Sequence, residues 1–267
     1  WQQNAPCNLK FMKKFVKYIF EKFGFEIRRK ISEKEVKYST FDEVYQKIIK
    51  NKNPVIFDIG AHKGQSIERF MKINKNSFIH SFEPNLDEFN YLKEKYYNFK
   101  NIKLNNLAIG EEKTKKTLNI TAHSGNSSFL DIKKDTNWIK LRTGQLGINT
   151  ENYVTKKIEV DLDTVDSYCN NNSINKIDIL KMDTQLYEEQ VLIGSEKMIR
   201  NQNIDAIEIE IVFSSVYEKY ACFSDIEKYL IPNNYRFSGI RLHNNNLFSG
   251  SIFFADILYL NKTKFNL

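Results

Sequence analysis

The sequence predicts an α/β fold, doubly wound around a mostly parallel sheet. The first observation is a short apolar run at residues 55–59, then a turn with Gly60 and Gly64, then helical spacing over residues 66–73. An apolar run bounded by turn signals is typical of a buried strand, and strand, glycine turn and helix in succession open a nucleotide-binding unit. The second observation is that strand-like and helix-like patterns alternate along most of the chain, as they do in α/β proteins.

The spacing of glycines and acids in the first two strands distinguishes between nucleotide cofactors. A dinucleotide site needs G-x-G-x-x-G, whereas this chain has D-x-G-x-x-x-G from Asp58 to Gly64. The next predicted strand, residues 77–82, is followed by Glu83, which lies 19 residues after Gly64 (83 − 64). A carboxylate at that distance can accept hydrogen bonds from both ribose hydroxyls. The pattern therefore indicates a ribonucleoside site without a pyrophosphate cradle, and S-adenosylmethionine (SAM) is the commonest cofactor of that kind.

The remaining elements follow from the same patterns. Thr40 and Glu43 match a capping box, which predicts a helix from Phe41 to about Lys50. Further patterns predict helices at 86–97, 165–169, 188–200 and 224–230, and strands at 102–107, 177–182, 204–213, 235–240 and 251–260. We expect the last two strands to form an antiparallel hairpin. The sheet then has seven strands, one of them antiparallel, with helices on both faces.

Residues 114–160 interrupt this alternation. Residues 116–121 and 156–162 alternate apolar and polar side chains, as exposed or edge strands do. The segment between them begins with a polar run at 122–128. Because long loops in compact domains are usually functional or disordered, we expect residues 114–160 to form a lid or insert that binds the acceptor.

Six segments carry a family resemblance. They are residues 57–65 (FDIGAHKGQ), 82–85 (FEPN), 106–110 (NLAIG), 161–166 (DLDTVD), 178–188 (DILKMDTQLYE) and 191–194 (VLIG). In these segments, and in their order, the chain resembles the FkbM-type family of SAM-dependent methyltransferases. One departure is Leu186, where the family usually has glycine. The resemblance implies a Rossmann-like class I methyltransferase fold, SAM as cofactor, and methyl transfer to a hydroxyl of a sugar, glycan precursor or secondary metabolite.

The expected cofactor-binding residues lie where predicted strands end. Ligands of open α/β sheets bind outside the carboxyl ends of the strands. The set is Asp58, Gly60, Ala61, Gly64, Glu83, Asn106, Ala108 and Asp183. Asp58 would hold the turn and the cofactor's amino group, with a helix N-cap as the alternative, and Glu83 would bind the ribose. By resemblance, the turn at 108–110 lies against the adenine.

Asp183 and His123 are the catalytic candidates. Asp183 ends an apolar strand, where a carboxylate is costly unless paired or useful. By resemblance it faces the methyl-transfer centre, where it could orient the acceptor hydroxyl or act as general base. His123 can titrate near neutrality, although a histidine in a polar loop is more often a surface residue. We expect His62 to shape the glycine turn and Glu188 to anchor the loop after Asp183. The sequence has no dense Asp and His cluster, so no metal site is predicted.

The charge distribution and the cysteine content indicate where the domains divide, which partners are excluded and where the protein is located. Residues 1–50 contain 12 Lys and Arg and 6 Asp and Glu, so they carry +6 of the total net charge of +7. The nearly neutral remainder argues against a nucleic-acid partner. We expect a basic amphipathic extension at residues 1–38 and a SAM-binding domain at residues 39–267. The three cysteines fit no disulfide or metal pattern, which favours a cytoplasmic location.

Residues 9–25 place apolar side chains at helical spacing opposite lysines. Such a helix either packs on its own domain or a dimer mate, or makes a peripheral contact with the inner membrane surface. For the whole chain the leading hypothesis is an O-methyltransferase. The alternatives are an N-methyltransferase, an NAD-dependent oxidoreductase and a non-catalytic SAM-binding module.

Overall fold

The computed structural model of this chain describes residues 16, 18, 20, 22–24, 40–214, 216–218, 221–243 and 252–265. From Thr40 onward the chain forms one compact unit, separate from the residues before it. Most of residues 9–25, the predicted amphipathic helix, lie outside the described residues, so that helix and its membrane or dimer contact stay predictions. No helix in the described part of the chain is long and apolar enough to cross a bilayer.

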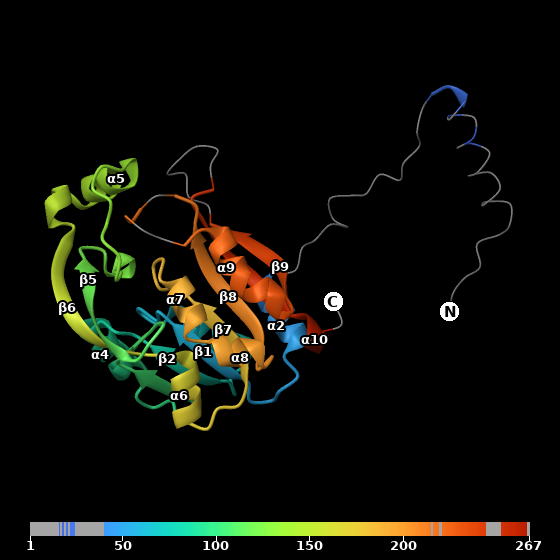
Figure 1. Ribbon diagram of the computed structural model, residues 1–267, viewed down its shortest axis with the longest axis horizontal. Coiled ribbons are helices and arrows are strands. Elements are labelled where there is room, and N and C mark those ends of the chain that lie inside the picture. The colour runs from blue at the N-terminus through green and yellow to red at the C-terminus, as the bar shows by residue number, and fades with distance from the viewer. Residues whose placement is uncertain are drawn as a thin grey trace. The chain divides into compact units, whose positions relative to one another are not determined.

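A seven-stranded sheet forms the centre of this unit (Figure 1). Its strands, in spatial order, are β3 (Ile102–Asn105), β2 (Phe78–Phe82), β1 (Val55–Ile59), β7 (Ile177–Met182), β8 (Ile204–Val212), β10 (Phe254–Asn261) and β9 (Tyr235–Leu242). Neighbouring strands pair in parallel except at β10, which is antiparallel to both β8 and β9. The predicted fold class and the single antiparallel strand are therefore confirmed.

Helices cover both faces of the sheet. On one face lie α2 (Phe41–Ile48), α3 (Gln65–Ile73) and α4 (Leu86–Tyr96), and on the other α6 (Val165–Asn171), α7 (Glu188–Ile193), α8 (Glu196–Arg200) and α9 (Phe223–Leu230). Successive strand side chains point to opposite faces. Ile56 accordingly packs with the first group of helices and Phe57 with the second, which makes two apolar cores. The chain closes with a short turn, η4 (Ile231–Asn233), before β9, and with α10 (Lys262–Phe265) after β10.

Two local details explain how individual helices begin and end. The capping box before α2 is present, because Thr40 Oγ1 accepts from Glu43 N at 3.2 Å and Thr40 N donates to Glu43 Oε2 at 2.8 Å. The single helix predicted at 188–200 is wrong, since the chain breaks there into α7 and α8 around Gly194. A Cβ at Gly194 would lie 2.0 Å from the carbonyl oxygen of Gly110, so close backbone contact requires glycine at this break.

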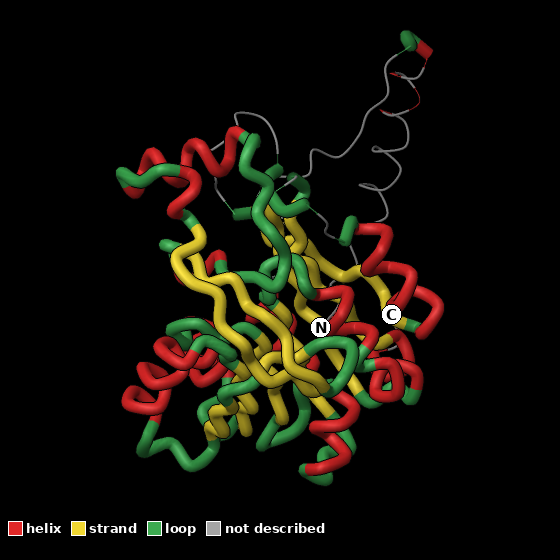
Figure 2. The backbone as a smooth tube through the Cα atoms, turned by 60° about the vertical axis from the view of Figure 1, so that its left-hand side comes forward, coloured by secondary structure: helices red, strands yellow, loops and turns green. Residues whose placement is uncertain are grey.

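A second, smaller sheet lies beside the first, in the order β4 (Ala108–Ile109), β6 (Val154–Asp163) and β5 (Thr114–Thr121). Between β5 and β6 are η2 (Ser124–Asn126), α5 (Asn137–Leu146) and η3 (Thr150–Asn152). Figure 2 shows β5 and β6 as a long ribbon that carries α5 at one end. The insert shares a small apolar cluster with the main domain, to which it contributes Trp138, Ile139 and Tyr153. We call residues 114–160 the lid.

Candidate active site

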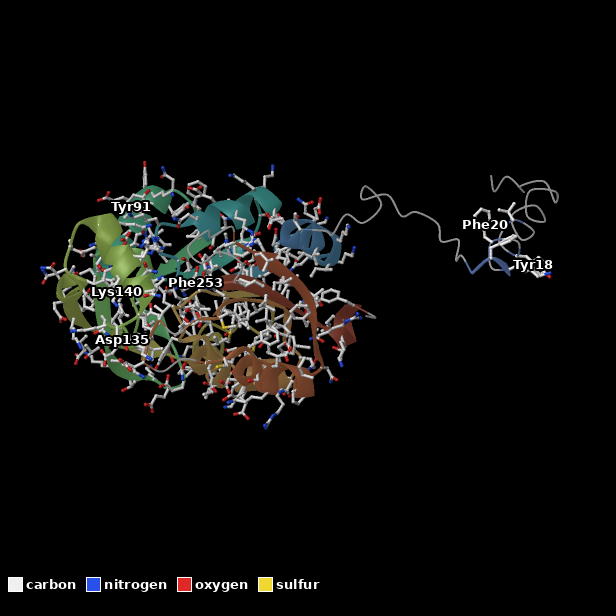
Figure 3. All side chains as sticks on the ribbon, turned by 90° about the horizontal axis from the view of Figure 1, so that it is seen from above. Tyr18, Phe20, Tyr91, Asp135, Lys140 and Phe253 are labelled. Carbon is white, nitrogen blue, oxygen red and sulfur yellow. The ribbon has the colours of Figure 1, made fainter. Side chains whose placement is uncertain are left out.

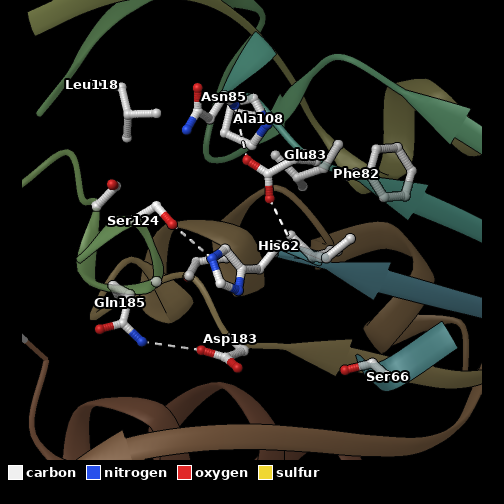
Figure 4. A pocket seen from close by; sticks show the side chains of 18 of the residues that line it. His62, Ser66, Phe82, Glu83, Asn85, Ala108, Leu118, Ser124, Asp183 and Gln185 are labelled. Atoms are coloured by element: carbon white, nitrogen blue, oxygen red, sulfur yellow. Dashed lines mark hydrogen bonds between the residues drawn. The ribbon is translucent and has the colours of Figure 1, made fainter. Parts of the chain in front are cut away.

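One cavity of about 420 Å³ lies at the carboxyl ends of the central strands, between the main sheet and the lid (Figure 4). Its walls come from the turn after β1, the end of β2, the turn at β4, the loop after β7, one residue of β8, and the lid. The lining residues include Gly60, Ala61, His62, Glu83, Ala108, Ser124, Lys181, Asp183, Gln185 and Glu210. Four residues predicted to bind the cofactor besides Asp183 (Gly60, Ala61, Glu83 and Ala108) line this one cavity.

The glycine turn brings three strand ends together. Gly60 N and Ala61 N both donate to the carbonyl oxygen of Phe82 at 3.1 Å. Gly60 has a φ of +85°, and a Cβ there would lie 1.9 Å from the carbonyl oxygen of Asp183. Glycine is required at this position because the backbones of β1 and β7 approach so closely.

Gly64 does not line the cavity. It precedes α3 with a φ of +81°, and a Cβ on it would lie 2.7 Å from the hydroxyl of Tyr96. That hydroxyl donates to the carbonyl oxygen of Gly64 at 3.1 Å. The structure therefore places this glycine where α3 packs on α4.

Glu83 lines one end of the cavity, and its position is fixed by backbone groups. It is 7% exposed, and its two carboxylate oxygens accept from His62 N at 2.7 Å and from Asn85 N at 2.9 Å. Burial raises the pKa of Glu83 to about 7. Figure 4 shows its carboxylate close to Ala108, which lines the same cavity. A carboxylate beside a small apolar side chain suits a ribose next to a flat base.

Two predicted cofactor residues lie behind the cavity wall. Asn106 donates its side-chain amide to the carbonyl oxygens of Glu83 at 2.9 Å and Pro84 at 3.1 Å, so it stabilises the loop that carries Glu83. Asp58 is fully buried in β1, 3.6 Å from Lys181 Nζ, and its oxygens have no hydrogen-bond partner among the described residues. Burial raises the pKa of Asp58, while Lys181 opposes that shift. Neither residue lines the cavity.

The opposite end of the cavity holds a cluster of four polar side chains. Gln185 Nε2 donates to Asp183 Oδ1 at 3.1 Å and to Glu210 Oε2 at 3.0 Å, so one amide bridges the two carboxyls. Lys181 Nζ donates to Asp183 Oδ2 at 3.3 Å. Burial opposes ionisation of Asp183, but Lys181 and Gln185 outweigh it and hold the Asp183 pKa below its ordinary value. Burial and the nearby Asp183 raise the pKa of Glu210 well above its ordinary value.

The loop after Asp183 has an unusual backbone. Gln185 and Leu186 have φ values of +56° and +70°, a left-handed conformation that costs side-chain-bearing residues free energy. Glu188 Oε1 accepts from Thr184 N at 2.7 Å and from Thr184 Oγ1 at 2.9 Å, which confirms the expected anchor. Leu186, where the family usually has glycine, thus keeps a left-handed backbone conformation that glycine adopts easily. Its side chain is 3% exposed and packs with Trp138 and Tyr153 of the lid.

The histidine at this site is His62 rather than His123. His123 is exposed and does not line the cavity. His62 has a φ of +45° within the glycine turn, and its Nε2 lies 2.9 Å from Ser124 Oγ of the lid. Burial lowers the pKa of His62, which favours the neutral ring. In Figure 4 this ring lies between Glu83 and Asp183.

The residues that sequence reasoning missed are Lys181, Gln185 and the cavity-lining role of His62. A lysine within an apolar strand was a usable signal, because buried lysine needs a partner. Gln185 carries no such signal. Within the described residues, no group of three or more His, Cys, Asp or Glu side chains could hold a metal ion.

The sequence matches a known protein family. The family described as methyltransferase FkbM domain matches residues 58–237, more than half of the chain. No curated protein matches the sequence.

Solved structures resemble the fold at low sequence identity. A methyltransferase FkbM from Methylobacillus flagellatus KT has a TM-score of 0.51 at 14% identity, covering 81% of this chain and 47% of that one. This chain thus spans about half the length of that protein. A TehB-like SAM-dependent methyltransferase from Corynebacterium glutamicum has a TM-score of 0.41 at 9% identity, covering 95% and 97%. The M. capricolum TrmK in complex with S-adenosylhomocysteine (SAH) has a TM-score of 0.41 at 12% identity, covering 84% and 69%.

Proposed function

The chain belongs to the FkbM methyltransferase family, whose cofactor is SAM, and we propose that it methylates a hydroxyl of a sugar, glycan precursor or secondary metabolite. The observation that supports this most is the division of one cavity into two ends. Glu83 lies at one end, and Asp183, bridged to Glu210 by Gln185, lies at the other. An enzyme that transfers a methyl group from a nucleoside cofactor to a hydroxyl must hold the cofactor and the acceptor in one space.

The cavity fits the cofactor. Its volume of about 420 Å³ lies within the usual range for small-molecule sites, roughly 300–1,000 Å³. Both Glu83 oxygens are held by backbone N–H groups and still have lone pairs for the ribose hydroxyls. Leu107, Ala108 and Ile109 form an apolar wall for the base. When bound, SAM supplies a methyl group on a sulfonium, an already good leaving group.

Asp183 is the residue that we assign to the acceptor hydroxyl. Because its pKa is held low, it is ionised at neutral pH and can accept a hydrogen bond from that hydroxyl. Lys181 and Gln185 hold the carboxylate in one orientation. Such an acid is a weak base toward an alcohol. Its main contribution is therefore to align an oxygen lone pair, which can supply much of the rate of an in-line displacement.

Calorimetric titration with SAM, SAH and NAD in parallel tests the cofactor. Binding of the first two without NAD is expected, and binding of NAD alone would instead support an oxidoreductase. Hydroxylated and amino acceptors are then screened with methyl-labelled SAM, which separates O-methylation, N-methylation and a non-catalytic module.

Asp183→Ala tests the catalytic assignment in the same assay. We expect turnover to fall by at least about 100-fold while SAH still binds. Asp135→Ala, an exposed acid of the lid, is the matched control and should keep full turnover. Unchanged turnover of Asp183→Ala would show that the acid acts elsewhere.

A further inference from the structure

A second cavity of about 80 Å³ adjoins the first on the lid side. The two cavities share Gln185 and Glu210, whereas Glu83 lines only the first. The second cavity therefore lies beyond the acidic end, on the side away from the nucleoside. A group bound there would extend from the position where the acceptor hydroxyl meets Asp183.

Four of the ten residues that line the second cavity are aromatic. Trp138 comes from α5 of the lid and Tyr217 from the segment after β8, while Phe254 begins β10 and Phe253 directly precedes it. Figure 3 labels Phe253 on the main body, toward the lid that carries Lys140. The Tyr217 hydroxyl already donates to the carbonyl oxygen of Asn126 at 3.0 Å, so its polar atom is satisfied. Walls of this kind suit the face or edge of a ring.

The cationic group of this cavity is Arg142 of α5. Among the residues that the structure describes, its buried Nε has no hydrogen-bond partner, and its Nη1 donates only to the Gln145 side chain, at 3.2 Å. In the described part of the chain no carboxylate forms an ion pair with Arg142. Glu210 faces the same cavity, but its raised pKa favours the neutral acid. A partly buried guanidinium without a counter-ion is costly, and a carboxylate is the group that its geometry matches best.

We propose that the second cavity binds the carboxylate-bearing edge of the methyl acceptor, which is a hydroxylated ring compound with a carboxylate substituent. The carboxylate lies at Arg142, the ring edge lies among the aromatic walls, and the hydroxyl points back toward Asp183. This assignment rests on the proposed function and narrows its substrate class from hydroxyl compounds to hydroxy acids. A cavity of this size takes a carboxylate and the ring edge next to it, while the rest of the acceptor lies in the larger cavity.

The experiment uses the full chain saturated with SAH and two matched pairs of compounds. The pairs are D-glucuronate with D-glucose, and 3-hydroxybenzoate with 3-hydroxybenzyl alcohol, each titrated by calorimetry. In at least one pair the acid should bind about tenfold or more tightly than its neutral partner, the scale of a hydrogen bond to a charged group. Trp138 is one of only two tryptophans in the chain, so the sugar pair is also followed by tryptophan fluorescence.

Four variants test whether Arg142 causes the preference for the acid and whether Trp138 reports its binding. Arg142→Gln should abolish the preference for the acid, and Arg142→Lys should keep part of it. Lys140→Gln removes an exposed positive charge from the same helix and should leave the preference unchanged. Trp138→Phe should remove the ligand-dependent fluorescence change. SAH affinity should be the same in all four variants.

The outcomes separate this inference from the proposed function. Failure of the wild-type chain to bind SAH would overturn the proposed function itself. SAH binding with equal affinity for acid and neutral compounds, with no binding of either, or with a preference that survives Arg142→Gln, would overturn the acceptor site alone.

Discussion

The loops after β2 and β7 both present a carboxylate to the same cavity, but they hold it in different ways. Glu83, after β2, is fixed by two backbone N–H groups. Asp183, after β7, is fixed by the side chains of Lys181 and Gln185, next to two consecutive residues with positive φ. The first arrangement depends on the path of the backbone, and the second depends on the identity of each neighbouring side chain.

This difference predicts which substitutions should impair function at each end of the cavity. Backbone donors survive most substitutions nearby, so the end of the cavity at Glu83 should lose function chiefly through changes of Glu83 itself. At the acidic end, Lys181 and Gln185 each hold one oxygen of Asp183, so substitution of either residue should disturb the carboxylate. That end is also where we propose that the acceptor binds.

The largest expected effect is that of Lys181→Met. Lys181 lies between Asp58 and Asp183, and its loss leaves Asp58 buried without a counter-ion. We expect the free energy of unfolding to fall by about 3–5 kcal/mol, measured by urea denaturation. Lys103→Met, an exposed lysine of β3, should change it by less than about 0.5 kcal/mol. Equal effects of the two variants would mean that the buried charges do not depend on Lys181.

Leu186, in the loop after Asp183, combines a strained backbone with a buried side chain. Leu186→Ala keeps the left-handed backbone and loses the contact with the lid, which should cost about 2–4 kcal/mol of unfolding free energy. Leu186→Gly should cost about 1 kcal/mol less, since glycine accepts a φ of +70°. At Leu92, within α4, the order should reverse, because glycine is worse than alanine in a helix. The same order at both positions would contradict a strained loop.

Glu83→Ala tests the proposed ribose role of Glu83. We expect SAH affinity to fall by about 1.5–3 kcal/mol, because two hydrogen bonds to a charged group are lost. Glu94→Ala, an exposed acid of α4, serves as the control and should bind SAH as the wild type does. A loss below a few tenths of a kcal/mol in calorimetry would remove the ribose role of Glu83.

The smallest expected effect is the pH dependence of SAH binding. The ionised form of Glu83, with a pKa of about 7, is the better acceptor, so binding should release a proton and strengthen by up to about tenfold from pH 6 to pH 8. For the free protein the sign is opposite. The folded-state pKa is raised above 4.5, so this group's contribution to stability is lost as the pH rises through 7.

Two variants decide whether Glu83 causes the pH dependence. Glu83→Gln should remove it, whereas Glu188→Gln should keep it. The pKa of Glu188 is also raised to about 7 by burial, but its carboxylate accepts from Thr184 and does not line the cavity. A flat profile in the wild type would place the Glu83 pKa outside this range.

Much of this architecture follows from local patterns. Apolar runs and helical spacing predict the seven strands and their helices, because each pattern needs only its own neighbours. Gly60 and Glu83 follow in the same way, since a turn after the first strand and an acid after the second must reach the same edge of a parallel sheet. The six motif segments also indicate the family to which the chain belongs.

The remaining features depend on which residues, distant in the sequence, meet in the folded chain. Asp58 does not line the cavity, because strand side chains alternate between the two faces of the sheet and its side chain lies on the face where it is 3.6 Å from Lys181 Nζ. The bridge from Gln185 to Glu210 required β7 and β8 to pair in their observed register. Arg142 lies beside that bridge only because the lid folds back on β8 and β10, a long-range contact that no spacing in the sequence encodes.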